Sequence, residues 1–295
     1  MRICFFMVLL VFNPFVYAEE MTATQPSVYP QLWNANDLAL QGGLENIVKQ
    51  QGLWKAIETK HLSLVVVNIS DLFRPKLAEL NGNKLIYAAS LPKIAILLAA
   101  FVEIESGNLV ETDELNEHLT KMIRYSSNQS ASHVLSLVGE DRLLEIIQSP
   151  KYALYDQERN GGLWVGKAYA KGRAYRRDPI GKLSHGATGI QVARFYYLLE
   201  TQQLLNPEYS NKMKQMLANP GINHKFVKGL KSVSGTRIYR KSGSWKNFHA
   251  DSALVEYGEH TYILVGLSDS KLAGDWFVKL AEPLHKLVTL GNTSQ

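Results

Sequence analysis

Residues 90–105 read SLPKIAILLAAFVEIE, and this stretch decides the fold. Every side chain from 94 to 102 is apolar, which predicts a helix buried on all sides at the centre of the molecule. A spacing of three places Lys93 one helical turn after Ser90, so its amine can lie within hydrogen-bond reach of the Ser90 hydroxyl. Pro92 is compatible with this position because the first turn of a helix has no partners for its N–H groups.

This pair predicts a nucleophile and its base. Burial lowers the pKa of a lysine, so Lys93 can be neutral and take the proton of Ser90. The pattern is weak by itself, because residues 268–271 (SDSK) repeat it at the end of a predicted strand. The alternative is that Ser90 only caps the helix and Lys93 is solvated. A lysine next to so apolar a helix needs a partner, however, which favours the catalytic interpretation.

Patterns on either side of this helix predict a mixed α/β (α+β) fold. Apolar spacing predicts helices over 44–58, 112–148, 188–201 and 211–218, with a closing helix over 272–290. Short runs rich in β-branched residues predict strands over 62–69, 76–87 (with a turn at 81–83), 237–242, 250–257 and 260–267. We expect an antiparallel sheet flanked by helices, formed by residues of about 41–89 and 230–290. An all-helical lobe of about 90–229 would complete the molecule, with the site between the two lobes.

A second motif, Ser126-Ser127-Asn128, lies in a turn of the helical region. The hydroxyl of Ser126 could pass a proton to a leaving nitrogen, and the amide of Asn128 could hold a substrate carbonyl. Residues 106–108 (SGN) have a similar pattern at the end of a helix, so an ordinary cap is the alternative.

A third motif, Lys241-Ser242-Gly243-Ser244, falls on a predicted strand. The cation of Lys241 beside the hydroxyl of Ser242 suits a substrate carboxylate, and Gly243 permits close approach to the backbone. The N–H of Ser244 could join that of Ser90 in an oxyanion hole. The alternative is an edge strand protected by a lysine.

These three motifs, in this order, resemble the signature set of class A β-lactamases and penicillin-binding proteins. Residues 125–132 resemble the family's SDN segment, with Ser127 where class A enzymes usually have Asp. Residues 241–257 resemble the strands around its KTG motif, with Ser242 replacing Thr, and Gly229-Leu230 also fits. The resemblance covers residues 41–290 and implies a β-lactamase/transpeptidase-like catalytic domain. It implies acyl transfer to Ser90, with Lys93 as base and Ser126 and Lys241 assisting the leaving nitrogen.

The resemblance is weakest in the loop over residues 160–187. Class A enzymes have a loop glutamate there, followed by proline and asparagine, which holds the water that frees the acyl-enzyme. The loop has one acidic residue, Asp178, before Pro179, and Lys182 stands in place of the asparagine. Asp178 would then be the deacylation base, or it would pair with its arginine neighbours in a structural ion pair. His185 and Glu158 are weaker candidates for the base.

The sequence is compatible with three functions. If Asp178 or a substitute activates water, the protein hydrolyses the amide bond of β-lactams. If nothing does, it behaves as a D-Ala-D-Ala carboxypeptidase or penicillin-binding protein with slow deacylation. The third function is a β-lactam or cell-wall sensor without turnover, for which the basic side chains of the loop could grip an anionic polymer. Those side chains are Lys167, Lys171, Arg173, Arg176, Arg177 and Lys182, and a solvated face is the simpler explanation.

The N-terminus predicts export. Arg2, an apolar core over 3–12 and the small-residue end at 16–18 are typical of a signal peptide over residues 1–18, with an extended lead-in over 19–40. The apolar core is too short for a stable membrane span, so we expect a periplasmic or secreted protein. The formal net charge of +5 is too small to indicate nucleic acid as a partner. The expected partners are a β-lactam or a peptidoglycan stem peptide, bound by a monomer.

No cofactor is expected, because the one cysteine is Cys4 and the eight histidines show no close metal-ligand spacing. Trp245 and Tyr125 adjoin the motifs and are expected to line the cleft. His249 and Asp251 are residue types of a catalytic triad, but Ser90 has a nearer base in Lys93.

Overall fold

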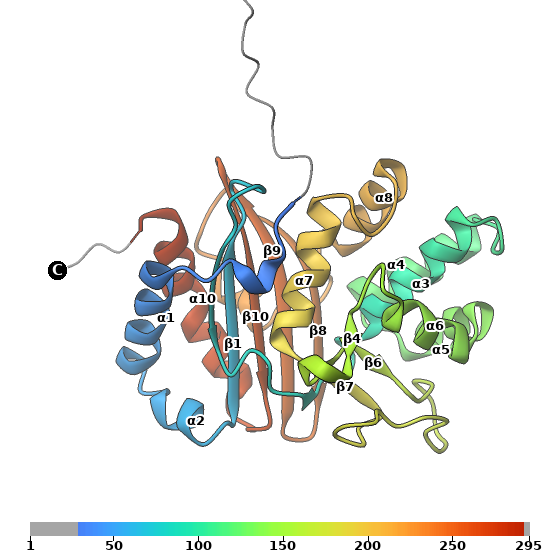
Figure 1. Ribbon diagram of the computed structural model, residues 1–295, viewed down its shortest axis with the longest axis horizontal. Coiled ribbons are helices and arrows are strands. Elements are labelled where there is room, and N and C mark those ends of the chain that lie inside the picture. The colour runs from blue at the N-terminus through green and yellow to red at the C-terminus, as the bar shows by residue number, and fades with distance from the viewer. Residues whose placement is uncertain (1–28, 292–295) are drawn as a thin grey trace, which may run out of the picture.

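A five-stranded antiparallel sheet forms the centre of the computed structural model, which describes residues 29–291 (Figure 1). Its strands are ordered β2-β1-β10-β9-β8, so the first two strands of the chain pair with the last three. The bounds are β1 Leu62–Asn68, β2 Lys76–Leu80, β8 Arg237–Trp245, β9 Phe248–Tyr257 and β10 His260–Ser268. The predicted sharing of one sheet by the two ends of the chain is therefore confirmed.

Helices cover both faces of this sheet. Along β1, Leu64 and Val66 pack in the core beneath α1 (Leu38–Gln50) and α10 (Ala273–Thr289). The alternate residues Val65 and Val67 pack in the other core, beneath α7 (Gly189–Glu200). The alternation follows from the period of two along a strand. Residues in α7, which were predicted to belong to the helical lobe, thus pack on the sheet.

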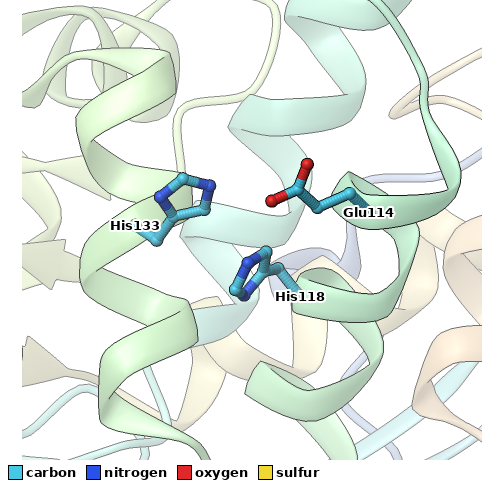
Figure 2. A group of neighbouring side chains, drawn as sticks. All are labelled: Glu114, His118 and His133. Carbon is cyan, nitrogen blue, oxygen red and sulfur yellow. The ribbon is translucent and has the colours of Figure 1, made fainter.

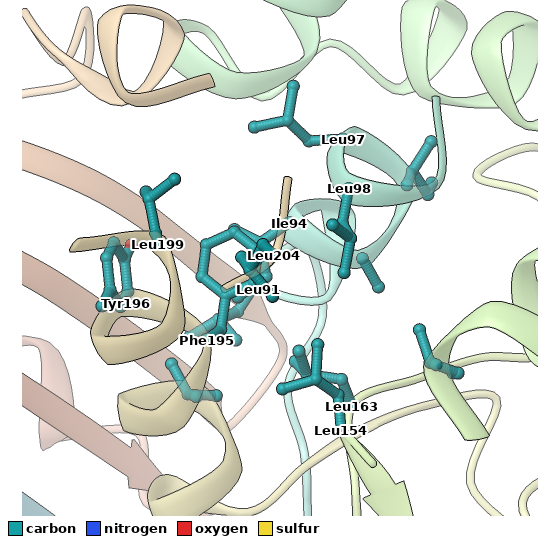
Figure 3. Close-up of a cluster of buried hydrophobic side chains, with 14 of the residues drawn as sticks. Leu91, Ile94, Leu97, Leu98, Leu154, Leu163, Phe195, Tyr196, Leu199 and Leu204 are labelled. Atoms are coloured by element: carbon teal, nitrogen blue, oxygen red, sulfur yellow. The ribbon is translucent and has the colours of Figure 1, made fainter. Parts of the chain in front are cut away.

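Most of the other helices form a lobe beside the sheet (Figure 1). At its centre, α3 (Lys93–Glu105) is buried at every position except the last. Its side chains Ile94, Leu97 and Leu98 belong to the same buried cluster as Phe195 and Tyr196 of α7 (Figure 3). Around it lie α4 (Asp113–Arg124), α5 (Asn128–Val138), α6 (Glu140–Gln148) and α8 (Pro207–Leu217).

Short elements connect the lobes. The strands β3 (Ile86–Tyr87), β7 (His185–Ala187) and β6 (Trp164–Val165) form a small second sheet. The strands β4 (Tyr155–Asp156) and β5 (Gly161–Gly162) form a third. The other short elements are the 3-10 helices η1 (Leu32–Asn34) and η2 (Gln157–Arg159) and the helices α2 (Trp54–Glu58) and α9 (Phe226–Gly229).

Three boundaries differ from the prediction. The strand expected over 76–87 is divided between β2 and β3, which belong to different sheets, because the chain turns after Leu80. The helix expected over 44–58 breaks at Gly52, whose φ of 69° is unfavourable within a helix. The loop over 160–187 contains three short strands. The expected signal peptide and most of the lead-in lie outside the described residues. Within residues 29–291, no helix combines the length and apolarity that crossing a membrane requires.

Candidate active site

Ser90 lies in the turn that joins β3 to α3. The turn is closed by a hydrogen bond from the N–H of Leu91 to the carbonyl of Ala88 (3.0 Å), with Ala89 in the left-handed region at φ 50°. The first residue of α3 is Lys93, three positions later than Ser90, so Ser90 precedes the helix that it was expected to open. The hydroxyl of Ser90 makes no hydrogen bond with the described residues, and it faces a cavity.

The side chain of Lys93 is completely buried. Its Nζ donates to the carbonyl of Ser126 (2.6 Å) and to Oδ1 of Asn128 (2.7 Å), and it lies 4.5 Å from the ring centre of Tyr169. Burial lowers the pKa of Lys93 from 10.5 to about 7, because none of these partners is an anion. The expected direct hydrogen bond to Ser90 is not formed. The amine instead holds the Ser126–Asn128 turn against the start of α3.

Ser126 adopts a left-handed backbone conformation, with φ 59°. This conformation is uncommon for a residue with a side chain and costs free energy, so the surrounding contacts must hold it. The Oγ of Ser126 accepts a hydrogen bond from Nζ of Lys241 (3.0 Å), and Nζ of Lys93 lies 3.5 Å away. Ser127 caps α5 by accepting from the N–H of Ser130 (3.1 Å). A single hydroxyl, that of Ser126, therefore lies between the two amines.

The third motif lies on β8, the edge strand of the main sheet beside Ser90. Lys241 is completely buried, and burial together with the positive charges of Lys93 and Arg240 lowers its pKa well below the usual value for lysine. A Cβ on Gly243 would lie 2.7 Å from the N of Ser90 and 2.2 Å from the carbonyl oxygen of Ala88. Only glycine permits this approach, which brings the β8 backbone beside the N–H of Ser90. Ser242, which is buried, and Ser244 flank it.

Lys225, which the sequence did not identify as a site residue, holds this strand in place through hydrogen bonds to β8 and β9. Lys225 is buried, and its Nζ donates to the carbonyls of Gly243 (2.6 Å) and Ala250 (2.9 Å) and to Oγ of Ser244 (2.9 Å). Burial lowers its pKa to about 8. Lys225 lies in no recognisable motif, and its partners are mainly backbone atoms distant in sequence.

Asp251 belongs to the same support. Its Oδ1 accepts from Nε of Arg240 (2.7 Å), and its Oδ2 accepts from the N–H of Phe226 (3.0 Å), with both charged side chains buried. Asp251 and His249 form no hydrogen bond, so no triad exists among the described residues. The ion pair fixes the chain before α9 against β8 and β9.

The motifs meet at a cavity of about 780 Å³. Ser90, Asn128 and Ser244 lie in its wall, together with the aromatic rings of Tyr87, Tyr169, Trp245 and Phe248. Lys167, Lys171 and Lys246 add positive charge, and no aspartate or glutamate lines the cavity among the described residues. Such a cavity suits an apolar substrate that carries a carboxylate.

Of the two aromatic residues expected at the cleft, one lies there. Trp245 lines the cavity with 58% of its surface exposed. Tyr125 is exposed but packs over Gly221, where an added Cβ would meet its ring at 2.3 Å.

Asp178, the residue proposed as deacylation base, does not line the cavity. It is completely buried, and its carboxylate accepts hydrogen bonds from the N–H groups of Ile180 (3.0 Å), Gly181 (2.7 Å) and Leu183 (2.5 Å). The hydroxyl of Tyr155 also donates to it, at 3.3 Å. Its oxygens are thus occupied in closing the turn, and the residue is not in the cavity wall. The expected ion pair with the neighbouring arginines is also absent from residues 29–291.

The other two candidates for a base lie in different places. His185 lines the cavity, donates from Nε2 to the carbonyl of Lys167 (2.9 Å), and has a pKa lowered to about 4, mainly by burial. It is therefore neutral near pH 7 but a weak proton acceptor. Glu158 is exposed in η2, outside the cavity wall.

The family model described as the beta-lactamase enzyme family matches residues 111–286, more than half of the chain. The chain belongs to this family. No curated protein matches its sequence closely enough to show a relationship.

Solved structures of β-lactamases and of PBP-A have the same fold as this chain, at low sequence identity. The β-lactamase from Sphaerobacter thermophilus DSM 20745 superposes with a TM-score of 0.67 at 16% identity, covering 84% of this chain and 97% of that one. PBP-A superposes with a TM-score of 0.64 at 15% identity, covering 88% and 97% of the two chains. A mutant of PBP-A, solved as an acyl-enzyme complex with penicillin G, gives a TM-score of 0.62 at 15% identity and covers 85% and 96%.

Proposed function

We propose that this β-lactamase family member is an exported serine hydrolase that forms an acyl-enzyme at Ser90 with β-lactams. The observation that carries the proposal is the buried amine of Lys93, which lies one turn after Ser90 with no anionic partner and a pKa of about 7. Such an amine is neutral in a large fraction of molecules at neutral pH and can accept a proton. Export rests on the signal-peptide pattern of residues 1–18.

The proposed reaction is acyl transfer. Lys93 accepts the proton of Ser90, whose oxygen attacks the carbonyl carbon of the lactam. The N–H groups of Ser90 and Ser244 stabilise the oxyanion as the C–O bond forms. The C–N bond then breaks, and the hydroxyl of Ser126 gives its proton to the departing nitrogen. Lys241, whose Nζ is 3.0 Å from that hydroxyl, replaces the proton.

We propose that the acyl-enzyme is long-lived, as in a penicillin-binding protein. General-base activation of water requires a proton acceptor within reach of the ester, and the described cavity wall contains no carboxylate. The natural substrate would then be a cell-wall peptide that ends in D-Ala-D-Ala, whose terminal carboxylate matches the basic cavity. In this mechanism Asp178 does not activate the hydrolytic water, because its carboxylate accepts hydrogen bonds within its own turn.

One observation favours a second candidate, a β-lactamase that turns over. If Lys93 returns to its neutral form after acylation, its pKa of about 7 suits it to activate the hydrolytic water as well. The two candidates differ in one measurable property, the lifetime of the adduct.

The test is intact-mass measurement after mixing the protein with benzylpenicillin. We expect a mass increase of one penicillin in the native chain and none in Ser90→Ala, with Ser268→Ala, the serine of the similar SDSK pattern, as a matched control that still labels. Labelling that persists in Ser90→Ala would refute the nucleophile. An adduct that outlasts dilution supports the penicillin-binding proposal, whereas rapid loss with nitrocefin turnover supports the β-lactamase candidate.

A further inference from the structure

Two histidines and a glutamate converge on the surface of the helical lobe, away from the cavity. Glu114 and His118 lie one turn apart on α4, and His133 lies opposite them on α5 (Figure 2). One ligand atom from each residue lies within 4.8 Å of the other two. The spacing of histidines along the sequence gave no indication of this cluster, because the packing of α4 on α5 brings together side chains that are distant in sequence.

The donor set indicates the class of ligand. Two imidazoles and one carboxylate match the preferences of Zn²⁺ and similar borderline cations, and three protein ligands leave a fourth position for water. Bonds of about 2.1 Å to a tetrahedral ion would space the donor atoms by roughly 3.4 Å. From separations of up to 4.8 Å, the ligand atoms therefore have to approach one another by up to about 1.4 Å, which partly exposed side chains can do by rotation about their side-chain bonds.

The contacts of the three residues leave them free to bind. Within residues 29–291, neither the carboxylate of Glu114 nor the ring of His133 forms a hydrogen bond or ion pair. The rings of His118 and His133 lie with their centroids 4.4 Å apart and their planes tilted by 43°. Nδ1 of His118 lies 3.2 Å from Oγ of the buried Ser130. If Nδ1 donates to that hydroxyl, Nε2 is left as the unprotonated ligand atom, and the hydrogen bond also fixes the orientation of the ring, as such bonds do for histidine ligands of metals.

We propose that Glu114, His118 and His133 bind one Zn²⁺. The ion would join α4 to α5 on either side of the turn at 125–127, which carries Ser126 between the two active-site amines. A cation that binds the folded chain and not the unfolded one stabilises the fold in proportion to its affinity. Bound Zn²⁺ would thus stabilise the position of the turn at 125–127, whatever substrate reacts at Ser90.

The experiment is titration of the chelator-treated full chain with Zn²⁺ by calorimetry, and with Co²⁺ by absorption. We expect one equivalent of Zn²⁺ to bind, a melting temperature raised by about 5 °C at saturating Zn²⁺, and the intense visible bands of four-coordinate Co²⁺. His133→Gln should weaken binding at least tenfold, and Glu114→Gln should weaken it and alter the Co²⁺ bands.

Two controls keep the test decisive. Glu117→Gln changes a neighbouring acid on α4 that pairs with Lys121, and His260→Gln removes a histidine of β10; both should bind Zn²⁺ as the native chain does. All variants alter side chains at least partly exposed, and circular dichroism without metal verifies their folding. Absence of Zn²⁺ binding in the native chain, or equal binding by His133→Gln and Glu114→Gln, would overturn the proposal. So would a loss of binding in His260→Gln.

Discussion

Lys93 and Lys241 are two buried amines that share the hydroxyl of Ser126, at 3.5 and 3.0 Å. Burial lowers the pKa of both amines, and the positive charge of Lys93 lowers the pKa of Lys241 further. The pair therefore favours a state in which one amine is neutral. Lys93, whose partners are the carbonyl of Ser126 and the amide oxygen of Asn128, is suited to be the neutral one.

The acylation rate should depend on pH through Lys93. Its pKa of about 7 means that the neutral base is lost as the pH falls below 7. We expect the rate of labelling by a fluorescent penicillin to be half-maximal near pH 7 and to fall about tenfold per unit below it. His185→Gln, which removes a group with a pKa of about 4, should leave the midpoint unchanged. A rate independent of pH around neutrality would contradict the role of Lys93.

The site residues that the sequence predicted are positioned by local spacing along the chain. The site residues that it missed are positioned by contacts with backbone atoms distant in sequence. Ser90 and Lys93 are related by one turn of chain, so their proximity follows from local spacing. The partners of Lys225 are the carbonyls of Gly243 and Ala250 on two strands, and no sequence pattern records a contact with backbone atoms. Asp178 was placed in the correct loop, but its role depends on N–H groups that the fold turns toward it.

At the scale of elements, the segment after β6 forms part of the cavity wall and contributes no carboxylate to it. Lys167 and Tyr169 near its start and His185 at its end line the cavity, and Asp178 closes the turn between them. The periodicity that reveals helices gave no signal for β4 to β7, because each of these strands has only two or three residues. The long strands and helices were predictable because apolar spacing repeats along them.

Asp178→Asn should act on stability and not on chemistry. The new amide would place an N–H group against N–H donors of Gly181 or Leu183, so we expect the free energy of unfolding to fall by about 2 kcal/mol. Urea denaturation measures this change. Asp141→Asn, an exposed acid paired with Arg176, is the matched control and should change stability little. Unchanged stability with abolished turnover would restore Asp178 as a catalytic base.

At the scale of the molecule, the site exists because the edge of the main sheet docks against the turn before α3. The sheet supplies Lys241 to Ser244, and the helical lobe supplies Ser126 and Asn128. At Gly243 the strand lies so near the nucleophile turn that an added Cβ would be 2.2 Å from the carbonyl oxygen of Ala88. The order of the motifs along the chain predicted that the strand and the helical lobe would meet at Ser90. The short distance between Gly243 and the Ser90 turn, however, is set by packing, which the sequence pattern does not record.

Gly243→Ala should separate the two parts of the site. The added methyl group would lie 2.2 Å from the carbonyl oxygen of Ala88, so the strand or the Ser90 turn has to shift. Because a displacement of about 1 Å can reduce a rate about a hundredfold, we expect acylation to slow by that order. Gly42→Ala in α1, where no atom lies within 4 Å of the added methyl, is the control. Full acylation by Gly243→Ala would show that the close approach is dispensable.

The buried lysines also have a consequence for the proton balance of unfolding. Lys93 and Lys225 have pKa values of about 7 and 8 in the folded protein, and both return toward 10.5 when the chain unfolds. Between pH 7 and pH 10 these two lysines bind more protons in the unfolded chain than in the folded chain, so unfolding takes up protons from the solvent. The contribution of these lysines therefore makes the fold more stable as the pH rises from 7 toward 10. Near neutral pH, the two lysines together carry less than two positive charges in the folded protein.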